Sequence, residues 1–227
     1  MSDLLQDLSF ENICYLDIGA NKPKFMNNTY LFYERGFRGV LVEPNSSLCE
    51  ELREERPGDV VLNVGVGIDE HISEADFYMF SEDIDGLNTF SHEVAEHWEN
   101  VGMDGEKYMI DRVVKVPLMN VNDIISNYFT DCPDFVSIDV EGLDLQVLET
   151  FDFAKYQPAI FCVETLAYNT DGSTYKIQPI FELLEDKGYF PYRETYANTI
   201  FANKKSYYDC HYQFARGNRV SDKIAHK

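Results

Sequence analysis

Ile13-Cys-Tyr-Leu-Asp-Ile-Gly-Ala-Asn21 is a short apolar run that ends in a polar turn with one glycine, and it predicts a buried strand. Residues 29–35 follow with helical period, and Asn27 or Asn28 is expected to cap that helix. A second strand, Gly39-Val-Leu-Val-Glu43, comes directly after it. A strand, a helix and another strand in this order are typical of a parallel sheet that helices cover.

The same alternation continues along the chain. Further helices are predicted at residues 46–56, 121–129, 143–151 and 177–187, and further strands at residues 60–66, 75–80, 112–116, 135–140, 159–163, 189–193 and 199–202. The last two strands are expected to pair as an antiparallel hairpin at one edge of the sheet. The sequence therefore predicts a Rossmann-like α/β fold with a mostly parallel sheet and helices on both faces. We expect residues 1–227 to form a single domain with a core of about residues 10–204.

Two regions depart from this alternation. Residues 81–111 contain little apolar periodicity, and we expect an insertion there that serves as a lid, with pivots at Gly86, Gly102 and Gly105. Residues 208–227 are polar and are expected to form a tail.

The composition indicates a soluble and strongly acidic protein. Asp and Glu number 40 against 19 Lys and Arg, a formal net charge of -21, which repels phosphate backbones, so nucleic acid is not an expected partner. No apolar stretch approaches the roughly 20 residues that cross a bilayer, and membrane insertion is not expected. The first seven residues lack the features of a signal peptide, and five cysteines without a C-x-x-C pair favour reduced thiols. We therefore expect a cytoplasmic protein.

The turn after the first strand has the chemistry of a nucleoside site. Ligands of open parallel sheets bind beyond the carboxyl ends of the strands, and Gly19 has no Cβ to keep a ligand away from the backbone. Glu43, at the tip of the second strand, can accept hydrogen bonds from both hydroxyls of a ribose. The predicted cofactor-binding residues are Asp17, Gly19, Ala20, Asn21, Glu43, Pro44, Gly65 and Asp139.

The nucleoside predicted for this turn is S-adenosylmethionine (SAM). Nicotinamide and flavin cofactors need a pyrophosphate cradle of the form G-x-G-x-x-G, whereas residues 19–24 are Gly-Ala-Asn-Lys-Pro-Lys. SAM has no phosphate, its ammonium needs an acceptor such as Asp17, and its cationic sulfonium tolerates acidic surroundings. Two alternatives stay open: a nucleotide-dependent oxidoreductase, which Glu43 favours, and a non-catalytic SAM-binding module.

Five segments of the chain resemble the FkbM family of SAM-dependent methyltransferases. They are Tyr15-Leu-Asp-Ile-Gly-Ala-Asn21, Asn28-Thr-Tyr-Leu-Phe-Tyr-Glu-Arg-Gly36, Gly39-Val-Leu-Val-Glu-Pro-Asn45, Asp134-Phe-Val-Ser-Ile-Asp-Val-Glu-Gly142 and Pro158-Ala-Ile-Phe-Cys-Val-Glu164. The similarity runs through most of residues 13–203. The resemblance implies a seven-stranded class I methyltransferase fold and O-methylation, commonly of a sugar or natural-product hydroxyl.

Methyl transfer to a hydroxyl needs a group that takes its proton or a metal that lowers its pKa. Asp139 and Glu141, near the end of the strand predicted at residues 135–140, are the first candidates for the base, and His92 in the insertion is the third. Asp139 and Glu164 are also candidates to bind a hard divalent ion such as Mg²⁺. The expected acceptor is a hydroxylated small molecule or a glycan.

Overall fold

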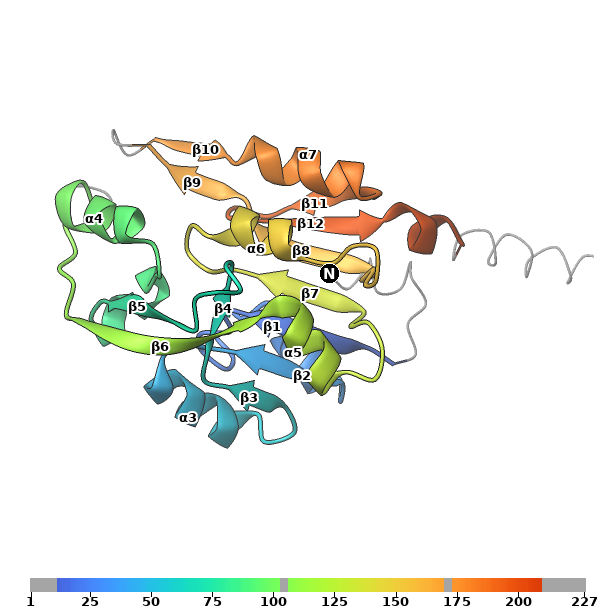
Figure 1. Cartoon of the computed structure of the whole chain (residues 1–227), viewed down its shortest axis with the longest axis horizontal. Coiled ribbons are helices and arrows are strands. Elements are labelled where there is room, and N and C mark those ends of the chain that lie inside the picture. The colour runs from blue at the N-terminus through green and yellow to red at the C-terminus, as the bar shows by residue number, and fades with distance from the viewer. Residues whose placement is uncertain (1–11, 103–105, 170–172, 210–227) are drawn as a thin grey trace, which may run out of the picture.

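Seven strands form the central sheet of the computed structural model, which describes residues 12–102, 106–169 and 173–209 (Figure 1). Their order across the sheet is β11 (Tyr189–Glu194), β12 (Asn198–Asn203), β8 (Ile160–Glu164), β7 (Phe135–Ile138), β1 (Cys14–Ile18), β2 (Arg38–Val42) and β3 (Val60–Leu62). β12 runs antiparallel to both of its neighbours, and the other neighbouring pairs are parallel. This order confirms the predicted α/β fold with a mostly parallel sheet and an antiparallel hairpin at one edge.

Helices cover both faces of this sheet. One face carries α5 (Val121–Tyr128), α6 (Asp144–Thr150) and α7 (Gln178–Asp186), and the other carries α2 (Tyr30–Glu34) and α3 (Ser46–Glu55). Along β1, Leu16 and Ile18 belong to the core cluster under α5, α6 and α7, whereas Tyr15 belongs to the cluster under α2 and α3. Successive side chains of a strand point to opposite faces of the sheet. A strand that is covered on both faces therefore needs apolar residues at successive positions, which is why β1 is a nearly continuous apolar run.

The predicted cap of the first helix is wrong. α2 begins after Thr29, and no side chain caps its first turn. The Asn27 amide instead donates to the Asp17 carboxylate at 3.4 Å, and the Thr29 hydroxyl donates to the same oxygen at 2.6 Å. The Asn28 amide donates to the Ser137 hydroxyl at 3.1 Å. These polar side chains lie at the end of the sheet instead of capping α2. Leaving a buried carboxylate without hydrogen-bond donors costs more free energy than leaving the first turn of a helix uncapped.

The third predicted strand divides at Asn63. β3 stays in the central sheet, and β4 (Gly65–Gly67) leaves it to pair in parallel with β6 (Arg112–Asn120). The Asn63 amide donates to the carbonyl oxygens of Glu43 and Pro44 at 3.0 and 2.9 Å, and these bonds hold the bend beside the end of β2. β6 also pairs antiparallel with β5 (Glu74–Met79), which gives a second, three-stranded sheet.

The insertion at residues 81–111 contains helices that the sequence did not predict. These are a 3₁₀ helix, η1 (Glu82–Leu87), and α4 (His92–Asn100). Phe80, Ala95 and Trp98 form a buried cluster between them. Of the predicted pivots, Gly102 has a φ of +70° and packs closely against the backbone of Glu106, and Gly105 lies outside the described residues.

A short hairpin of β9 (Leu166–Tyr168) and β10 (Thr174–Lys176) was also missed. The Tyr168 ring lies 5.2 Å from the Trp98 ring, so this hairpin packs against the insertion. Strands of three residues are too short for the alternation of polar and apolar residues to identify them.

Three further expectations concern the tail, a helix that could cross a membrane, and the cysteines. Of the predicted tail at residues 208–227, the structure describes only residues 208 and 209. Over the described ranges, no helix has the length and apolar character needed to cross a bilayer. The cysteines in those ranges are free thiols: Cys14, Cys49, Cys132 and Cys162.

Candidate functional site

A cavity of about 370 Å³ opens where β1, β2 and β7 end. Its volume lies in the range of about 300–1,000 Å³ that is typical of small-molecule sites. The lining includes every residue that the sequence analysis assigned to the cofactor: Asp17, Gly19, Ala20, Asn21, Glu43, Pro44, Gly65 and Asp139. They meet because parallel strands bring their carboxyl ends to the same edge of the sheet.

The turn after β1 leaves no room for a side chain at position 19. Gly19 has a φ of +81°, and a Cβ there would lie 1.7 Å from the carbonyl oxygen of Asp139. The amides of Gly19 and Ala20 both donate to the carbonyl oxygen of Val42, at 3.0 and 3.1 Å. The turn is therefore held tightly between the ends of β2 and β7, with its backbone exposed to the cavity.

Glu43 ties the β1 turn to the start of α3. Its two carboxylate oxygens accept from the amides of Asn21 and Asn45 at 2.8 and 2.7 Å, and the residue is 4% exposed. Burial raises the pKa of this carboxyl to about 7, although both amides oppose the shift. A carboxylate has about four acceptor sites. Two hydrogen bonds to amides therefore leave capacity for the two hydroxyls of a ribose.

Asp17 is 1% exposed at the end of β1. Burial raises the pKa of its carboxyl, and the hydrogen bond from Thr29 and the positive charge of Arg56 oppose that rise. The Asp17 carboxylate is thus a buried acceptor that lines the cavity and is oriented by the loop after β1.

Arg56 is the buried cation behind that loop, and the sequence analysis missed its role. Its side chain is 0% exposed and forms an ion pair with Asp59 at 2.8 Å. Its guanidinium also donates to the Tyr15 hydroxyl, the Thr29 hydroxyl and the Asn27 side-chain oxygen, at 3.0, 3.0 and 2.9 Å. An arginine at the end of a helix is normally solvated. The available signal was the Arg-Pro-Gly-Asp turn that places Arg56 and Asp59 three residues apart.

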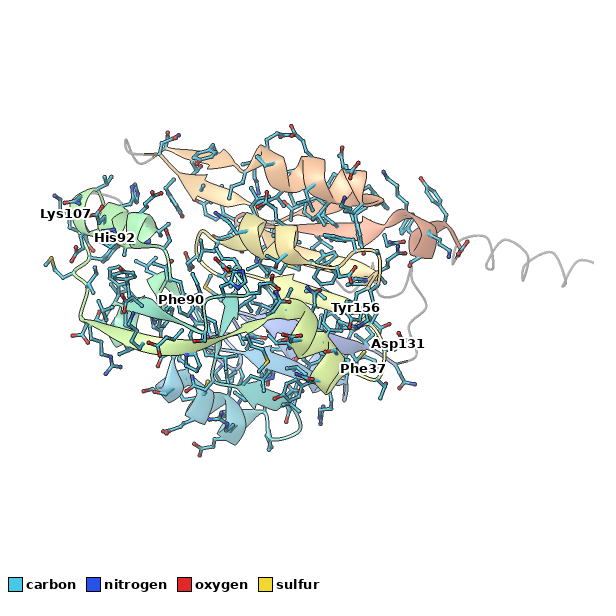
Figure 2. All side chains as sticks on the ribbon, in the orientation of Figure 1. Phe37, Phe90, His92, Lys107, Asp131 and Tyr156 are labelled. Atoms are coloured by element: carbon cyan, nitrogen blue, oxygen red, sulfur yellow. The ribbon has the colours of Figure 1, made fainter. Side chains whose placement is uncertain are left out.

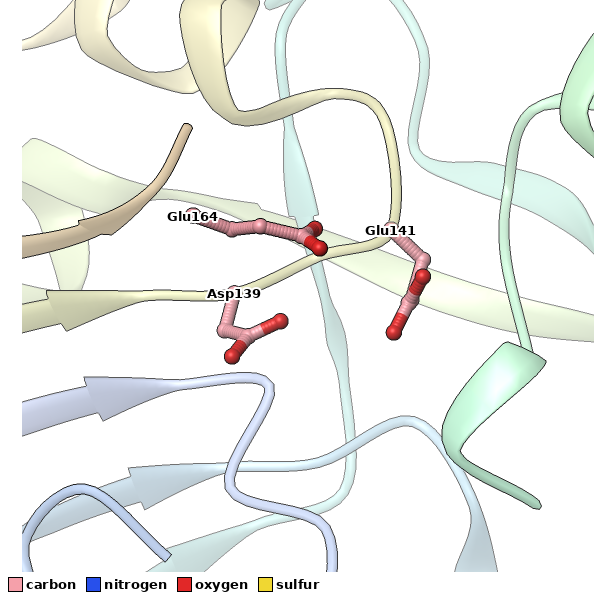
Figure 3. Close-up of side chains that lie close together, drawn as sticks. All are labelled: Asp139, Glu141 and Glu164. Atoms are coloured by element: carbon pink, nitrogen blue, oxygen red, sulfur yellow. The ribbon is translucent and has the colours of Figure 1, made fainter. Parts of the chain in front are cut away.

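Three carboxylates lie close together at the ends of β7 and β8, and two of them, Asp139 and Glu141, line the cavity (Figure 3). One oxygen each of Asp139, Glu141 and Glu164 lies within 4.8 Å of the others. The sequence predicts Asp139 and Glu164 as a pair of metal ligands, and the structure adds Glu141 to them. Carboxylate oxygens are the type of ligand that Mg²⁺ prefers.

The carboxylates of this cluster hold their protons more strongly than usual. Burial, followed by the negative charge of Asp17, raises the pKa of Asp139 to about 6. Burial and the neighbouring carboxylates raise the pKa values of Glu141 and Glu164 well above their usual range. Like charges in a shared low-dielectric space cannot all ionise without a compensating cation. The cluster is therefore suited to accept a proton or to hold a cation.

His92 does not join this cluster. Its side chain is 62% exposed on α4, where Nδ1 lies 3.8 Å from Glu96 and the ring lies 5.5 Å from the Tyr78 ring. In Figure 2 it lies on the outer side of the insertion, whereas Phe90 lies further in, and of the two only Phe90 lines the cavity.

The insertion supplies one wall of the cavity, where apolar side chains lie beside Asp83, Asp85 and Asn88. Its lining residues include Ile84, Leu87, Phe90 and Tyr108. Lys22, in the β1 turn, forms an ion pair with Asp85 of η1 at 3.4 Å, which joins the turn to the insertion. The predicted lid is therefore a packed segment that borders the site.

A model of the methyltransferase FkbM domain matches residues 17–191. Among solved structures, the chain is similar to a precorrin-6y C5,15-methyltransferase from Geobacter metallireducens, with 11% identity over 88% of this chain and 85% of that chain and a TM-score of 0.42. It is also similar to the O-methyltransferase from Bacillus cereus in complex with SAH, with 13% identity over 88% and 76% of the two chains and a TM-score of 0.40. A search of curated proteins found no match.

Proposed function

Because the chain belongs to the FkbM family of methyltransferases, we propose that it transfers the methyl group of SAM to a hydroxyl oxygen of a sugar, a glycan or a small natural product. The observation that carries this proposal is the cavity whose lining contains the Gly19 turn and Glu43 together with the carboxylates Asp139 and Glu141. The first two suit a nucleoside, and the last two suit the removal of a hydroxyl proton. Methylation of a hydroxyl needs both in one enclosed space.

The residues around the β1 turn fit SAM. A Cβ at Gly19 would clash with the carbonyl oxygen of Asp139, so only glycine lets the turn pack this closely against the end of β7, and the turn also lines the cavity. Glu43 has acceptor capacity for the ribose hydroxyls, and Asp17 is the acceptor proposed for the ammonium group. When bound, SAM supplies a methyl group made electrophilic by the positive charge on sulfur.

The protein's own part is to hold the acceptor, exclude water and take a proton. In-line attack needs the acceptor oxygen roughly 3–3.5 Å from the methyl carbon, in a site that water cannot enter freely. We assign the exclusion of water to the aromatic side chains of the insertion that line the cavity, Phe90 and Tyr108. We assign the proton to the Asp139 and Glu141 carboxylates, with Glu141 as the leading base.

SAM is expected to stabilise the protein against heat, and NAD is not. At about 100 times its dissociation constant a ligand adds roughly 2.7 kcal/mol to the free energy of unfolding, which raises Tm by roughly 5–10 °C in a chain of this size. A melting scan with SAM, its demethylated product and NAD measures the difference. A shift with NAD and none with SAM would favour the nucleotide-dependent oxidoreductase instead.

The metal hypothesis for Asp139 and Glu164 has its own test. If Mg²⁺ sits at the carboxylate cluster and lowers the pKa of the acceptor hydroxyl, exhaustive treatment with EDTA lowers turnover by roughly tenfold or more. Readdition of Mg²⁺ then restores it. Full turnover after chelation removes the metal from the reaction and leaves the carboxylates as general bases.

The acidic composition supports the choice of acceptor class. With a formal charge of -21, the protein is proposed to act on small hydroxylated molecules or glycans and not on nucleic acid. A screen of glycans and hydroxylated metabolites with SAM labelled in its methyl group identifies the acceptor.

The cytoplasm remains the location that we propose for the protein.

A further inference from the structure

The peptide group between Glu141 and Gly142 is held at both of its ends. The carbonyl oxygen of Glu141 accepts a hydrogen bond from the Thr89 hydroxyl at 2.8 Å. The amide of Gly142 donates to the Asp144 carboxylate at 3.3 Å, and the same carboxylate accepts from the Val140 amide at 3.2 Å. Asp144 is the first residue of α6, directly after the loop, whereas Thr89 comes from the insertion, 52 residues before Glu141 in the chain.

Thr89 is itself held in place by hydrogen bonds to Tyr78 and Ser91. The residue is 1% exposed, and its amide and carbonyl groups pair with those of Tyr78 in β5 at 3.1 and 2.9 Å. Its hydroxyl oxygen accepts from the Ser91 amide at 2.9 Å. A hydroxyl has one proton to donate. With the Ser91 amide on the oxygen, that proton is directed at the Glu141 carbonyl.

The loop needs support from outside because its backbone conformation is unfavourable. Glu141 has a φ of +53°, in the left-handed region that residues with a Cβ rarely adopt. Gly142 follows with a φ of +102°, and a Cβ there would lie 2.7 Å from a methyl carbon of Val94 in α4. Residues in such conformations persist where the surrounding structure holds them. Here Thr89 and Val94 of the insertion do so.

We propose that Thr89 is a positioning residue, which holds the Glu141 backbone so that its carboxylate joins Asp139 and Glu164 at the acceptor side of the cavity. The insertion then does more than border the site, because it completes the geometry of the carboxylate cluster. This inference rests on the proposed function for its catalytic consequence. The contact between Thr89 and Glu141 can be tested without an acceptor.

The test compares Thr89→Val, which removes the hydroxyl and keeps the branched shape, with Thr89→Ser, which keeps the hydroxyl. Ser91→Ala is the matched control, since the Ser91 hydroxyl caps α4 at Val94 but does not contact Glu141. Amide hydrogen exchange at Gly142, measured by NMR, reports opening of the loop. We expect exchange about tenfold faster in Thr89→Val, and close to the wild-type rate in Thr89→Ser and Ser91→Ala.

Methyl transfer gives the second readout. Thr89→Val should lower kcat by roughly tenfold with the KM for SAM unchanged, and Thr89→Ser should restore kcat. Ser91→Ala should lower Tm without a change in kcat, which separates positioning from general stability. Unchanged exchange at Gly142 in Thr89→Val overturns the inference even where wild-type protein binds SAM. If wild-type protein does not bind SAM, the proposed function fails, and the exchange rates still decide whether Thr89 holds the loop.

Discussion

Glu141→Gln is expected to lower the kcat of methyl transfer roughly 100-fold or more, because proton removal by a positioned base contributes about 10²–10⁴-fold. Gln has nearly the shape of Glu but cannot take the proton of the acceptor. The substitution leaves the backbone carbonyl that Thr89 contacts in place. The residues proposed to hold the nucleoside, Gly19 and Glu43, are also untouched, so the dissociation constant of SAM should change by no more than about twofold. Calorimetry with SAM and a turnover assay measure the two quantities.

Two variants complete this experiment. Asp139→Asn should also lose turnover, since Asp139 lies in the same carboxylate cluster, and its affinity for SAM tests the assignment of Asp139 to the cofactor. His92→Ala tests the histidine hypothesis on a side chain that is 62% exposed, and we expect it to keep its turnover. Wild-type turnover in both Glu141→Gln and Asp139→Asn would show that neither carboxylate takes the proton. Loss of turnover in His92→Ala, with turnover kept in the two carboxylate variants, would show that His92 is the base.

The dependence of wild-type turnover on pH should follow the ionisation of Glu141. Burial and the negative charges of Asp139 and Asp144 raise the pKa of Glu141 well above its usual range. A general base acts in its ionised form, so turnover should rise with pH as Glu141 loses its proton and should be lowest in acid. The rising part of the profile should be absent from the residual turnover of Glu141→Gln.

Arg56→Met is expected to lower the free energy of unfolding by about 3–5 kcal/mol, the usual effect of removing one member of a buried ion pair. The side chains of Arg56 and Asp59 are both 0% exposed. Without the guanidinium, the Asp59 carboxylate stays buried without its cation, and the hydroxyls of Tyr15 and Thr29 lose a donor. Unfolding in urea measures the change, and the affinity for SAM should fall as well because the loop beside Asp17 loses its support.

Arg53→Met is the control for a charge lost from the same helix. Arg53 lies on the exposed face of α3, and its removal should change the free energy of unfolding by less than about 1 kcal/mol. In the double variant Arg56→Met/Asp59→Asn, part of the stability should return, since no uncompensated charge stays buried. A loss in Arg56→Met as small as that in Arg53→Met would contradict the structural role of the ion pair.

The residues at the ends of the strands could be predicted because they depend on local pattern and on one rule of topology. Asp17, Glu43 and Asp139 each follow or end a short apolar run, and parallel strands bring those ends together. The prediction that His92 could be the base did not rest on a strand end or on a rule of topology. It depended on the path of the insertion, where α4 turns the imidazole outward. The caps predicted for α2 were wrong because the buried Asp17 carboxylate competes for the same polar side chains.

The sequence by itself determined the central sheet, its antiparallel edge hairpin, the family and a set of residues that line one cavity. Alternation, strand ends and motifs are properties of neighbouring residues, so they can be read from the chain. Only the tertiary structure decided that Glu141 joins Asp139 and Glu164, that Thr89 holds it from 52 residues away, and that Arg56 is buried beneath Tyr15, 41 residues away. Burial and partners of this kind depend on how distant segments pack, because a charge or a strained turn is stable only where those segments supply its hydrogen bonds.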